Sequence, residues 1–213
     1  MEPRKHKISN PIRDKSLNGA NGVKLILGSA SKGRKKILES MGYDFEIMPA
    51  DIDEKAIRSD DSEKLTLMLA RAKADALLPK IKEPALLITL DQVGVCNGQI
   101  IGKPENEAQA REYLENYARY PAKTITAVAI TNTKTGKRVE GVDMAEVLFY
   151  PIPEEAIRQS VKKGDIFNQS GAFSIDDEIL GRYVKEIKGE PESVIGLPKK
   201  LTRKLLNEMI EKW

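Results

Sequence analysis

Residues 86–104, LLITLDQVGVCNGQIIGKP, decide the fold because they combine two strand patterns with a turn. The apolar run at 86–90 has the length and composition of a buried strand. A second run at 93–96 leads into Asn97-Gly98, a dipeptide typical of hairpin turns. The returning strand is expected at 99–101. This stretch therefore predicts a buried strand followed by a hairpin.

Polar residues follow the predicted strands of this stretch. Asp91 and Gln92 follow directly on the first apolar run, so we expect them at a strand end, and Lys103 comes just past the hairpin. A carboxylate, an amide and a lysine in these places suit a site that handles a phosphate through a metal ion. An ordinary hairpin with a solvated Asp91 and Lys103 is the alternative.

Composition limits the class of protein. The chain has 213 residues, 40% hydrophobic and 31% charged, as in a globular protein able to bury a core. Its formal net charge of +3 is too small to indicate a nucleic-acid partner. No apolar run approaches the roughly 18 residues that span a membrane. We therefore expect neither a nucleic acid nor a membrane as partner.

The N-terminal 22 residues are polar and without periodicity, which predicts a disordered extension before a single catalytic domain at 23–213. His6 lies in that extension, where we expect it to be solvated. The single cysteine, Cys96, indicates a reducing compartment and a cytoplasmic location. With only these two residues, the sequence argues against a His/Cys zinc site. Carboxylates must then hold any metal ion, which indicates magnesium or manganese.

A strand, loop and helix near the start of the domain form a candidate anion site. A strand is predicted at 23–27, a small-hydroxyl loop with a basic turn at 28–36, and a helical pattern at 37–42. This geometry offers backbone N–H groups and a positive helix end to an anion. Basic residues are disfavoured at a helix N-terminus, so a bound polyphosphate would explain them; a serine cap followed by a solvated basic turn is the alternative. The candidate side chains are Ser29, Ser31, Arg34 and Lys35.

An acidic loop and an amphipathic helix come next. A strand predicted at 43–48 ends at a loop whose acids are candidate metal ligands, although solvated loop acids are the commoner explanation. The helix predicted at 62–80 carries Lys73 near its apolar stripe, beside alanines that permit close packing. The three loop acids are Asp51, Asp53 and Glu54.

The rest of the chain alternates helices and strands and includes hairpins. This pattern predicts an α/β fold with a mixed rather than a purely parallel sheet. The expected elements are a helix at 106–117, a strand at 124–131, one or two strands within 137–150, a helix at 153–162, a long polar loop at 164–177, a strand at 183–187, a Gly/Pro turn at 193–198 and a helix at 199–213.

Six motifs in order resemble the Maf family of nucleoside triphosphate pyrophosphatases. They are LILGSASKGRKKIL, DIDE, LARAKA, LDQVGVCNGQIIGKP, FNQSGAF and SVIGLP, and the match covers about residues 24–209. The resemblance implies an elongated mixed sheet flanked by helices, in two lobes with a cleft, as in inosine triphosphate pyrophosphatases. It also implies a divalent cation, a homodimer, and hydrolysis of a nucleoside triphosphate between its α- and β-phosphates to monophosphate and pyrophosphate.

The resemblance also implies roles for single residues. Asp91 matches the general base that activates water, and Glu54 matches an acid that binds the metal ion, with Asp91 as its companion ligand. Lys73 and Lys103 match two phosphate-facing lysines. The phosphate-binding loop is matched by Ser29, Ser31, Arg34 and Lys35, although Lys35 stands where the family has an arginine.

Two positions indicate the branch of the family that acts on 7-methylguanosine triphosphate. That branch reads Asp-Gln where this chain has Asp91-Gln92, and it places an acid at the position of Asp176. A carboxylate there can accept hydrogen bonds from guanine N1–H and N2–H and complements the charge of the methylated base. A pyrimidine or broad-range pyrophosphatase is the alternative enzyme, and a non-catalytic nucleotide-binding regulator of cell division is the alternative of another class.

Overall fold

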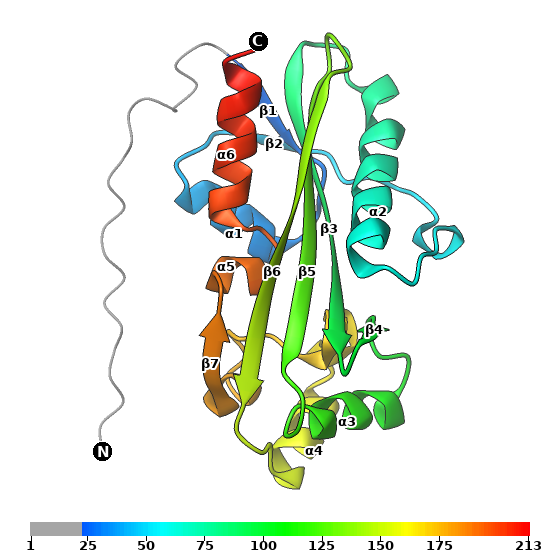
Figure 1. Cartoon of the computed structure of the whole chain (residues 1–213), viewed down its shortest axis with the longest axis vertical. Coiled ribbons are helices and arrows are strands. Elements are labelled where there is room, and N and C mark those ends of the chain that lie inside the picture. Colours follow the sequence, from blue (N-terminus) through cyan, green and yellow to red (C-terminus); the bar gives the residue numbers. More distant parts are fainter. Residues whose placement is uncertain (1–22) are drawn as a thin grey trace.

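The computed structural model of the chain describes residues 23–213 (Figure 1). The extension predicted at 1–22, with His6, lies outside the described residues. Within them, seven strands form one mixed sheet in the order β2-β1-β3-β5-β6-β7, and β4 pairs with β3. β1 is parallel to β2 and β3, and the other pairs are antiparallel. The strands are β1 Lys24–Leu27, β2 Glu46–Ile47, β3 Ala85–Cys96, β4 Gln99–Ile101, β5 Ala122–Asn132, β6 Arg138–Phe149 and β7 Val184–Lys188.

Helices flank the sheet, so the predicted mixed α/β class is confirmed. They are α1 Lys32–Ser40, α2 Ser62–Leu77, α3 Glu107–Asn116, α4 Glu154–Lys163, α5 Pro191–Ile195 and α6 Lys199–Ile210. Short 3₁₀ helices are η1 Glu54–Ala56, η2 Leu78–Lys80, η3 Asp165–Asn168, η4 Ser170–Ala172 and η5 Leu180–Tyr183. No helix among these residues is long and apolar enough to cross a membrane.

Alternating side chains of the strands divide the upper core into two layers. Leu25 and Leu27 of β1 pack with α1 and α6, whereas Ile26 packs on the opposite face with α2. Alanines let α2 lie close to the sheet: Ala70 packs against Ala127 and Ala129 of β5. The close approach of α2 brings its polar face near the middle of β3.

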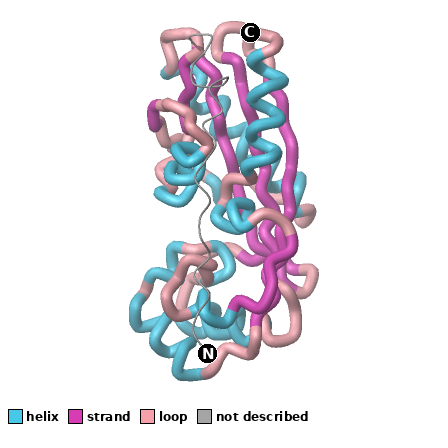
Figure 2. The backbone as a smooth tube through the Cα atoms, turned by 90° about the vertical axis from the view of Figure 1, so that its left-hand side faces the viewer, coloured by secondary structure: helices cyan, strands magenta, loops and turns pink. Residues whose placement is uncertain are grey.

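The long strands β3, β5 and β6 run the length of the molecule and join two lobes (Figures 1 and 2). One lobe holds β1, β2, α1, α2 and α6. The other holds α3, α4, β4 and β7 around its own apolar cluster, in which Tyr117 stacks on Phe149 at 5.3 Å and meets Phe173 edge-on at 5.4 Å. The predicted two-lobed arrangement is thus confirmed.

Three expected boundaries were wrong. The strand expected to end at Asp91 continues as one 12-residue strand to Cys96, so Asp91 and Gln92 lie mid-strand rather than at a strand end. Pairing with β5 along residues 86–95 carries the ladder through both polar residues. The strand expected at 43–48 is only two residues long, and the turn expected at 193–198 begins inside the short helix α5.

Candidate active site

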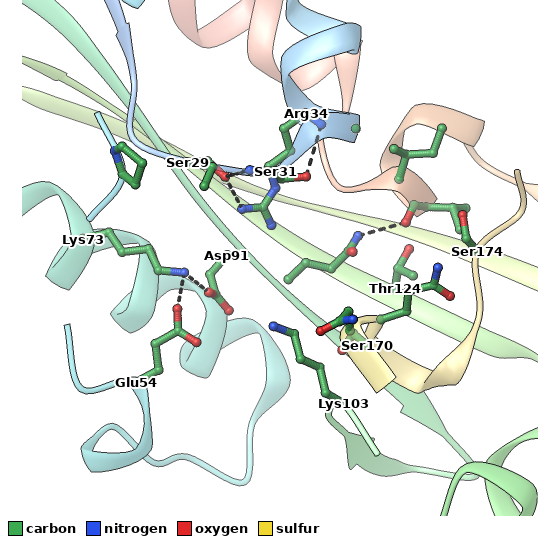
Figure 3. Close-up of a pocket in the computed structure, with 18 of the residues that line it drawn as sticks. Ser29, Ser31, Arg34, Glu54, Lys73, Asp91, Lys103, Thr124, Ser170 and Ser174 are labelled. Atoms are coloured by element: carbon green, nitrogen blue, oxygen red, sulfur yellow. Dashed lines mark hydrogen bonds and ion pairs between the residues drawn. The ribbon is translucent and has the colours of Figure 1, made fainter. Parts of the chain in front are cut away.

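A cleft of about 560 Å³ lies between the lobes, with β3 and β5 as its floor (Figure 3). Both lobes contribute to its walls, through the β1–α1 loop on one side and the segment after η3 on the other. Its lining residues include Gly28, Ser29, Ser31, Arg34, Glu54, Lys73, Asp91, Gln92, Lys103, Thr124, Asn168, Gln169, Ser170, Phe173, Ser174, Ile175, Val194 and Ile195.

The β1–α1 loop forms one wall of the cleft. Ser31 is the N-cap of α1, and its side chain accepts a hydrogen bond from the Arg34 backbone N–H at 3.3 Å. The Ser29 hydroxyl accepts from the backbone N–H of Ser31 at 3.3 Å. Within its first turn, α1 carries no acidic residue. The loop therefore presents a positive helix end, hydroxyl groups and a guanidinium to the cleft.

Arg34 is half-buried and ties three segments together. Its Nε donates to the carbonyl of Gly196 at 3.0 Å, and its Nη1 donates to Ser29 Oγ and to the Leu90 carbonyl, both at 3.3 Å. Burial lowers the pKa of the Arg34 guanidinium, and the charges of Asp91 and Glu54 oppose that shift. A guanidinium held in this way is a fixed positive charge at the cleft wall.

Lys35 does not join this wall. Its Nζ pairs with Glu39 of the same helix at 3.7 Å, its side chain is half exposed, and it is absent from the lining of the cleft. Helical geometry explains the difference, since adjacent helix positions point in directions about 100° apart. The structure therefore separates Lys35 from the three other residues predicted to bind phosphate.

A lysine between two carboxylates lies where α2 meets the floor of the cleft at β3. Lys73 Nζ lies 2.6 Å from Asp91 Oδ1 and 2.7 Å from Glu54 Oε1 (Figure 3). The side chains of Lys73 and Asp91 are only 12% and 9% exposed, whereas that of Glu54 is 57% exposed. Three segments distant in sequence, α2, β3 and η1, thus bring together three of the four predicted catalytic residues.

Burial sets the protonation behaviour of Asp91. Desolvation raises the pKa of its carboxyl group, while the positive charges of Lys73 and Arg34 pull it down and the charge of Glu54 adds to the rise. The net result is a raised pKa, so this carboxylate is a stronger base than an exposed aspartate. Such a group is suited to accept a proton from a water molecule.

The carboxylates also fit a divalent cation that is shared with a substrate. Mg²⁺ is usually held by one or two carboxylates, with phosphate oxygens and water completing its shell. Asp91 and Glu54 supply that pair, both reaching the same Lys73 Nζ. Within residues 23–213, no three acidic, His or Cys side chains form an all-protein metal cage. The other loop acids do not line the cleft, and Asp53 instead accepts the Lys55 backbone N–H at 3.1 Å.

Gln92 lies where β3, β5 and α5 meet. Its Nε2 donates to the Ser193 carbonyl at 2.7 Å and to Thr126 Oγ1 at 2.8 Å. Because a carbonyl can only accept, this contact fixes the orientation of the amide and leaves Oε1 as its open end. Gln92 therefore offers the cleft a hydrogen-bond acceptor.

Lys103 also reaches the cleft, as predicted, whereas Asp176 does not line it. The exposed Lys103 side chain points into the cleft (Figure 3) and forms no hydrogen bond or ion pair within residues 23–213. Asp176 is exposed just beyond Ser174 and Ile175, which do line the cleft. Its predicted contact with a base would require this loop to fold over a bound nucleotide.

Five polar residues that line the cleft were not predicted as site residues, namely Thr124, Asn168, Gln169, Ser170 and Ser174. Thr124 of β5 is 3% exposed, and its Oγ1 has no partner within the described chain; the same holds for the buried Oε1 of Gln169. A buried polar atom without a partner is costly, so a ligand that supplies one is favoured. Thr124 lies within an apolar strand pattern, and Gln169 within the motif FNQSGAF, so neither residue stands out in the sequence as a site residue.

The mixed sheet, the cationic β1–α1 loop and the cluster of Lys73 with two carboxylates define an α/β protein with a cleft for an anionic, phosphate-bearing ligand. The sequence model of the family described as Maf-like protein matches residues 24–209, and the chain belongs to this family. The resemblance inferred from the six motifs is thereby confirmed.

Individual relatives support the same conclusion. A protein of Dictyostelium discoideum named 7-methyl-GTP pyrophosphatase is 45% identical over 192 residues, covering 87% of this chain and 96% of that protein. A nucleoside triphosphate pyrophosphatase of Synechococcus sp. (strain JA-2-3B'a(2-13)) is 33% identical over 188 residues, covering 87% and 93%. A dTTP/UTP pyrophosphatase of Vibrio vulnificus (strain YJ016) is 32% identical over 187 residues, covering 88% and 99%.

Proposed function

We propose that this protein is a nucleoside triphosphate pyrophosphatase that releases pyrophosphate and a nucleoside monophosphate. The observation that carries the proposal is the buried pair of Lys73 and Asp91, extended by Glu54, which shares one cleft with Arg34 and the β1–α1 loop. A general base, cations and an anion-binding helix end are the parts that hydrolysis of a polyphosphate needs. The names of the relatives agree with this activity.

Each residue then has a chemical role. Asp91 accepts a proton as a water molecule attacks the α-phosphorus in line, and the electrons of the broken P–O bond leave with pyrophosphate. Lys73 holds Asp91 in place and, with Lys103 and Arg34, stabilises the negative charge that develops on the phosphate oxygens. Ser29 and Ser31 orient the phosphates from the β1–α1 loop.

A divalent cation, Mg²⁺ or Mn²⁺, belongs to this proposal. Glu54 and Asp91 are the residues that would hold it. The Glu54 side chain is exposed, the Asp91 side chain is nearly buried, and both line the cleft. When bound, such an ion neutralises polyphosphate charge. Chelation with EDTA should abolish turnover, and adding back Mg²⁺ or Mn²⁺ should restore it.

The preferred substrate in this proposal is 7-methylguanosine triphosphate. The open Oε1 of Gln92 and the unpartnered Oε1 of Gln169 are acceptors, which complement the N1–H and N2–H donors of guanine. Asp176 adds a negative charge at the mouth of the cleft that suits a cationic methylated base. The 45% identical relative carries the same substrate in its name. A pyrimidine triphosphate is the second candidate, favoured by the dTTP/UTP pyrophosphatase among the relatives.

The testing experiment measures pyrophosphate release from 7-methylguanosine, guanosine, thymidine and uridine triphosphates with Mg²⁺ or Mn²⁺. Faster turnover of the methylated nucleotide is expected. Preference for a pyrimidine would contradict the substrate assignment but keep the reaction. Absence of turnover in a folded protein that still binds these nucleotides would contradict the enzyme and favour the non-catalytic regulator.

Assembly and location complete the proposal. We expect a homodimer, which analytical ultracentrifugation of the purified chain can test against a monomer mass of 23.7 kDa. We also expect a cytoplasmic location, because the single cysteine, Cys96, is a buried free thiol that suits a reducing compartment. Fractionation of cells that express the full chain would test it.

A further inference from the structure

The cleft segment that follows η3 has an unusual backbone. Gly171 and Ala172 both adopt positive φ values, 74° and 60°. A non-glycine residue in this left-handed region is strained and persists only where its surroundings hold it. Such a conformation beside a cleft calls for an identifiable restraint.

Tyr117 supplies that restraint. Its hydroxyl donates a hydrogen bond to the Gly171 carbonyl at 2.6 Å, and its ring is 2% exposed between Phe149 and Phe173. Burial raises the pKa of the Tyr117 hydroxyl well above its usual value, so it remains a donor throughout the neutral range. A Cβ on Gly171 would lie 2.6 Å from this hydroxyl oxygen, which shows how closely the two groups pack.

The same segment holds the residues that lead to Lys103. The Gly171 N–H donates to the Gly102 carbonyl at 2.9 Å, and Ser170 Oγ donates to the Ile101 carbonyl at 3.3 Å. Lys103 comes directly after these two acceptors, past the end of β4. Since its side chain has no partner within the described residues, the backbone that ends at Gly102 is what sets the region of the cleft that its ammonium group can reach.

We infer that Tyr117 is a positioning residue that sets the location of Lys103 in the cleft through Gly171 and Gly102. The inference rests on the proposed function only for the role of Lys103, because the chain of contacts itself is independent of any activity. Loss of the hydroxyl leaves the Gly171 carbonyl without its donor, and the left-handed pair is then free to relax. Lys103 should follow this movement, because the carbonyl of its neighbour Gly102 accepts a hydrogen bond from the Gly171 N–H.

The direct test is amide hydrogen exchange in Tyr117→Phe, which keeps the ring and removes the hydroxyl. Exchange should accelerate in peptides that cover residues 99–105 and 168–173 and stay unchanged at 24–40. Tyr113→Phe is the matched control, since Tyr113 lies on α3, one turn before Tyr117 at the C-cap of that helix, and packs against the same cluster. Unchanged exchange at 168–173, or an equal change in the control, would overturn the inference. This result does not depend on whether the protein turns over nucleotides.

The kinetic test is a double-mutant cycle with Lys103→Met. Tyr117→Phe should lower kcat by about 10-fold with little change in KM, because a misplaced catalytic charge weakens transition-state stabilisation. In the Lys103→Met background the same substitution should have no further effect, whereas in Lys73→Met it should keep its 10-fold cost. An equal loss in both backgrounds would show that Tyr117 acts elsewhere. Absence of turnover in the wild-type protein would instead contradict the proposed function.

A second variant covers the case in which Tyr117→Phe does not fold. Ser170→Ala removes the hydroxyl that donates to the Ile101 carbonyl and accepts from the Gly94 N–H at 3.2 Å. Exchange should accelerate at 99–105 in this variant, and its effect on kcat should likewise shrink in the Lys103→Met background. If residues 99–105 exchange as in the wild type, this segment does not restrain Lys103.

Discussion

The ammonium group of Lys73 lies 2.6 Å from the carboxylate of Asp91, and both side chains are nearly buried at the edge of an open cleft. The contact joins α2 to the middle of β3, where Ala70 packs so closely that Thr89 Oγ1 donates to its carbonyl at 2.8 Å. Removing one partner of such a pair leaves a charge in a poorly solvated place. The pair therefore links the protonation of Asp91 to the presence of Lys73.

Lys73→Met should shift the pH dependence of turnover. Asp91 acts as a base in its ionised form, so activity falls as pH drops through its pKa, which burial already raises and Lys73 holds down. Without Lys73 the pKa rises further, and the acid limb of a kcat/KM–pH profile should move to higher pH. Lys64→Met, an exposed position on the same helix, is the control. An acid limb that stays in place would show that Lys73 does not tune Asp91.

Asp91→Asn should lower kcat by about 10²–10⁴-fold, because the amide keeps the shape of the side chain but cannot accept the proton. Nucleotide binding, measured by calorimetry, should persist since the Arg34 wall is untouched. Asp75→Asn is the matched control: Asp75 is an exposed acid of α2 that pairs with Arg138. Turnover equal to that of the wild type would remove Asp91 from its assigned role.

Arg34→Lys should raise KM by about 10-fold and lower Tm by about 4 °C. A lysine cannot reach Gly196, Leu90 and Ser29 together, so at least one carbonyl loses its donor. Thermal denaturation and initial rates check the two effects. Lys35→Met should leave both nearly unchanged, because Lys35 lies outside the cleft. A KM defect of similar size in Lys35→Met would mean that this lysine reaches the substrate.

Selectivity should depend on Gln92 and Asp176. Gln92→Ala removes the fixed acceptor for guanine N1–H and N2–H, so it should lower the ratio of kcat/KM for 7-methylguanosine triphosphate over uridine triphosphate. Asp176→Asn removes the charge, so it should lower the ratio for 7-methylguanosine triphosphate over guanosine triphosphate. The charge effect should be larger for the methylated base, because only that base is cationic. If Asp176→Asn keeps the wild-type ratio, the loop does not close over the base.

The features of the fold that were predicted correctly depend on residues close together in the sequence. Strand, loop and helix at 23–42 and the Asn97-Gly98 turn follow from patterns within a few residues, and Asn97 and Gly98 do adopt positive φ values of 49° and 74°. The helix at 62–80 began where expected because Asp61 caps it, accepting from the Glu63 and Lys64 N–H groups.

The strand end that was predicted wrongly, at Asp91 and Gln92, depends on partners distant in the sequence. Asp91 and Gln92 looked like a strand end because polar residues interrupt an apolar run. They remain inside β3 because Lys73 pairs with the first, while Thr126 and Ser193 accept hydrogen bonds from the second. The members of these pairs are 18, 34 and 101 residues apart in the sequence, so a local strand or helix pattern could not reveal them.

Residue roles were harder to predict than residue proximity. The sequence grouped Arg34 and Lys35 as one basic pair. In the structure Arg34 lines the cleft, whereas Lys35, the next residue of the helix, points away from it and pairs with Glu39. Tyr117 was expected only to form part of a helix, because a tyrosine on an apolar face carries no signal of the carbonyl that it binds.

The uninterrupted strands β3, β5 and β6 have a mechanical consequence. Both lobes are built on the same three continuous strands, so they are not separate domains joined by a linker. A change in the width of the cleft therefore requires this shared sheet to twist or bend. The loops attached to the sheet can vary with the nucleobase without any change in the strands that carry Asp91 and Thr124.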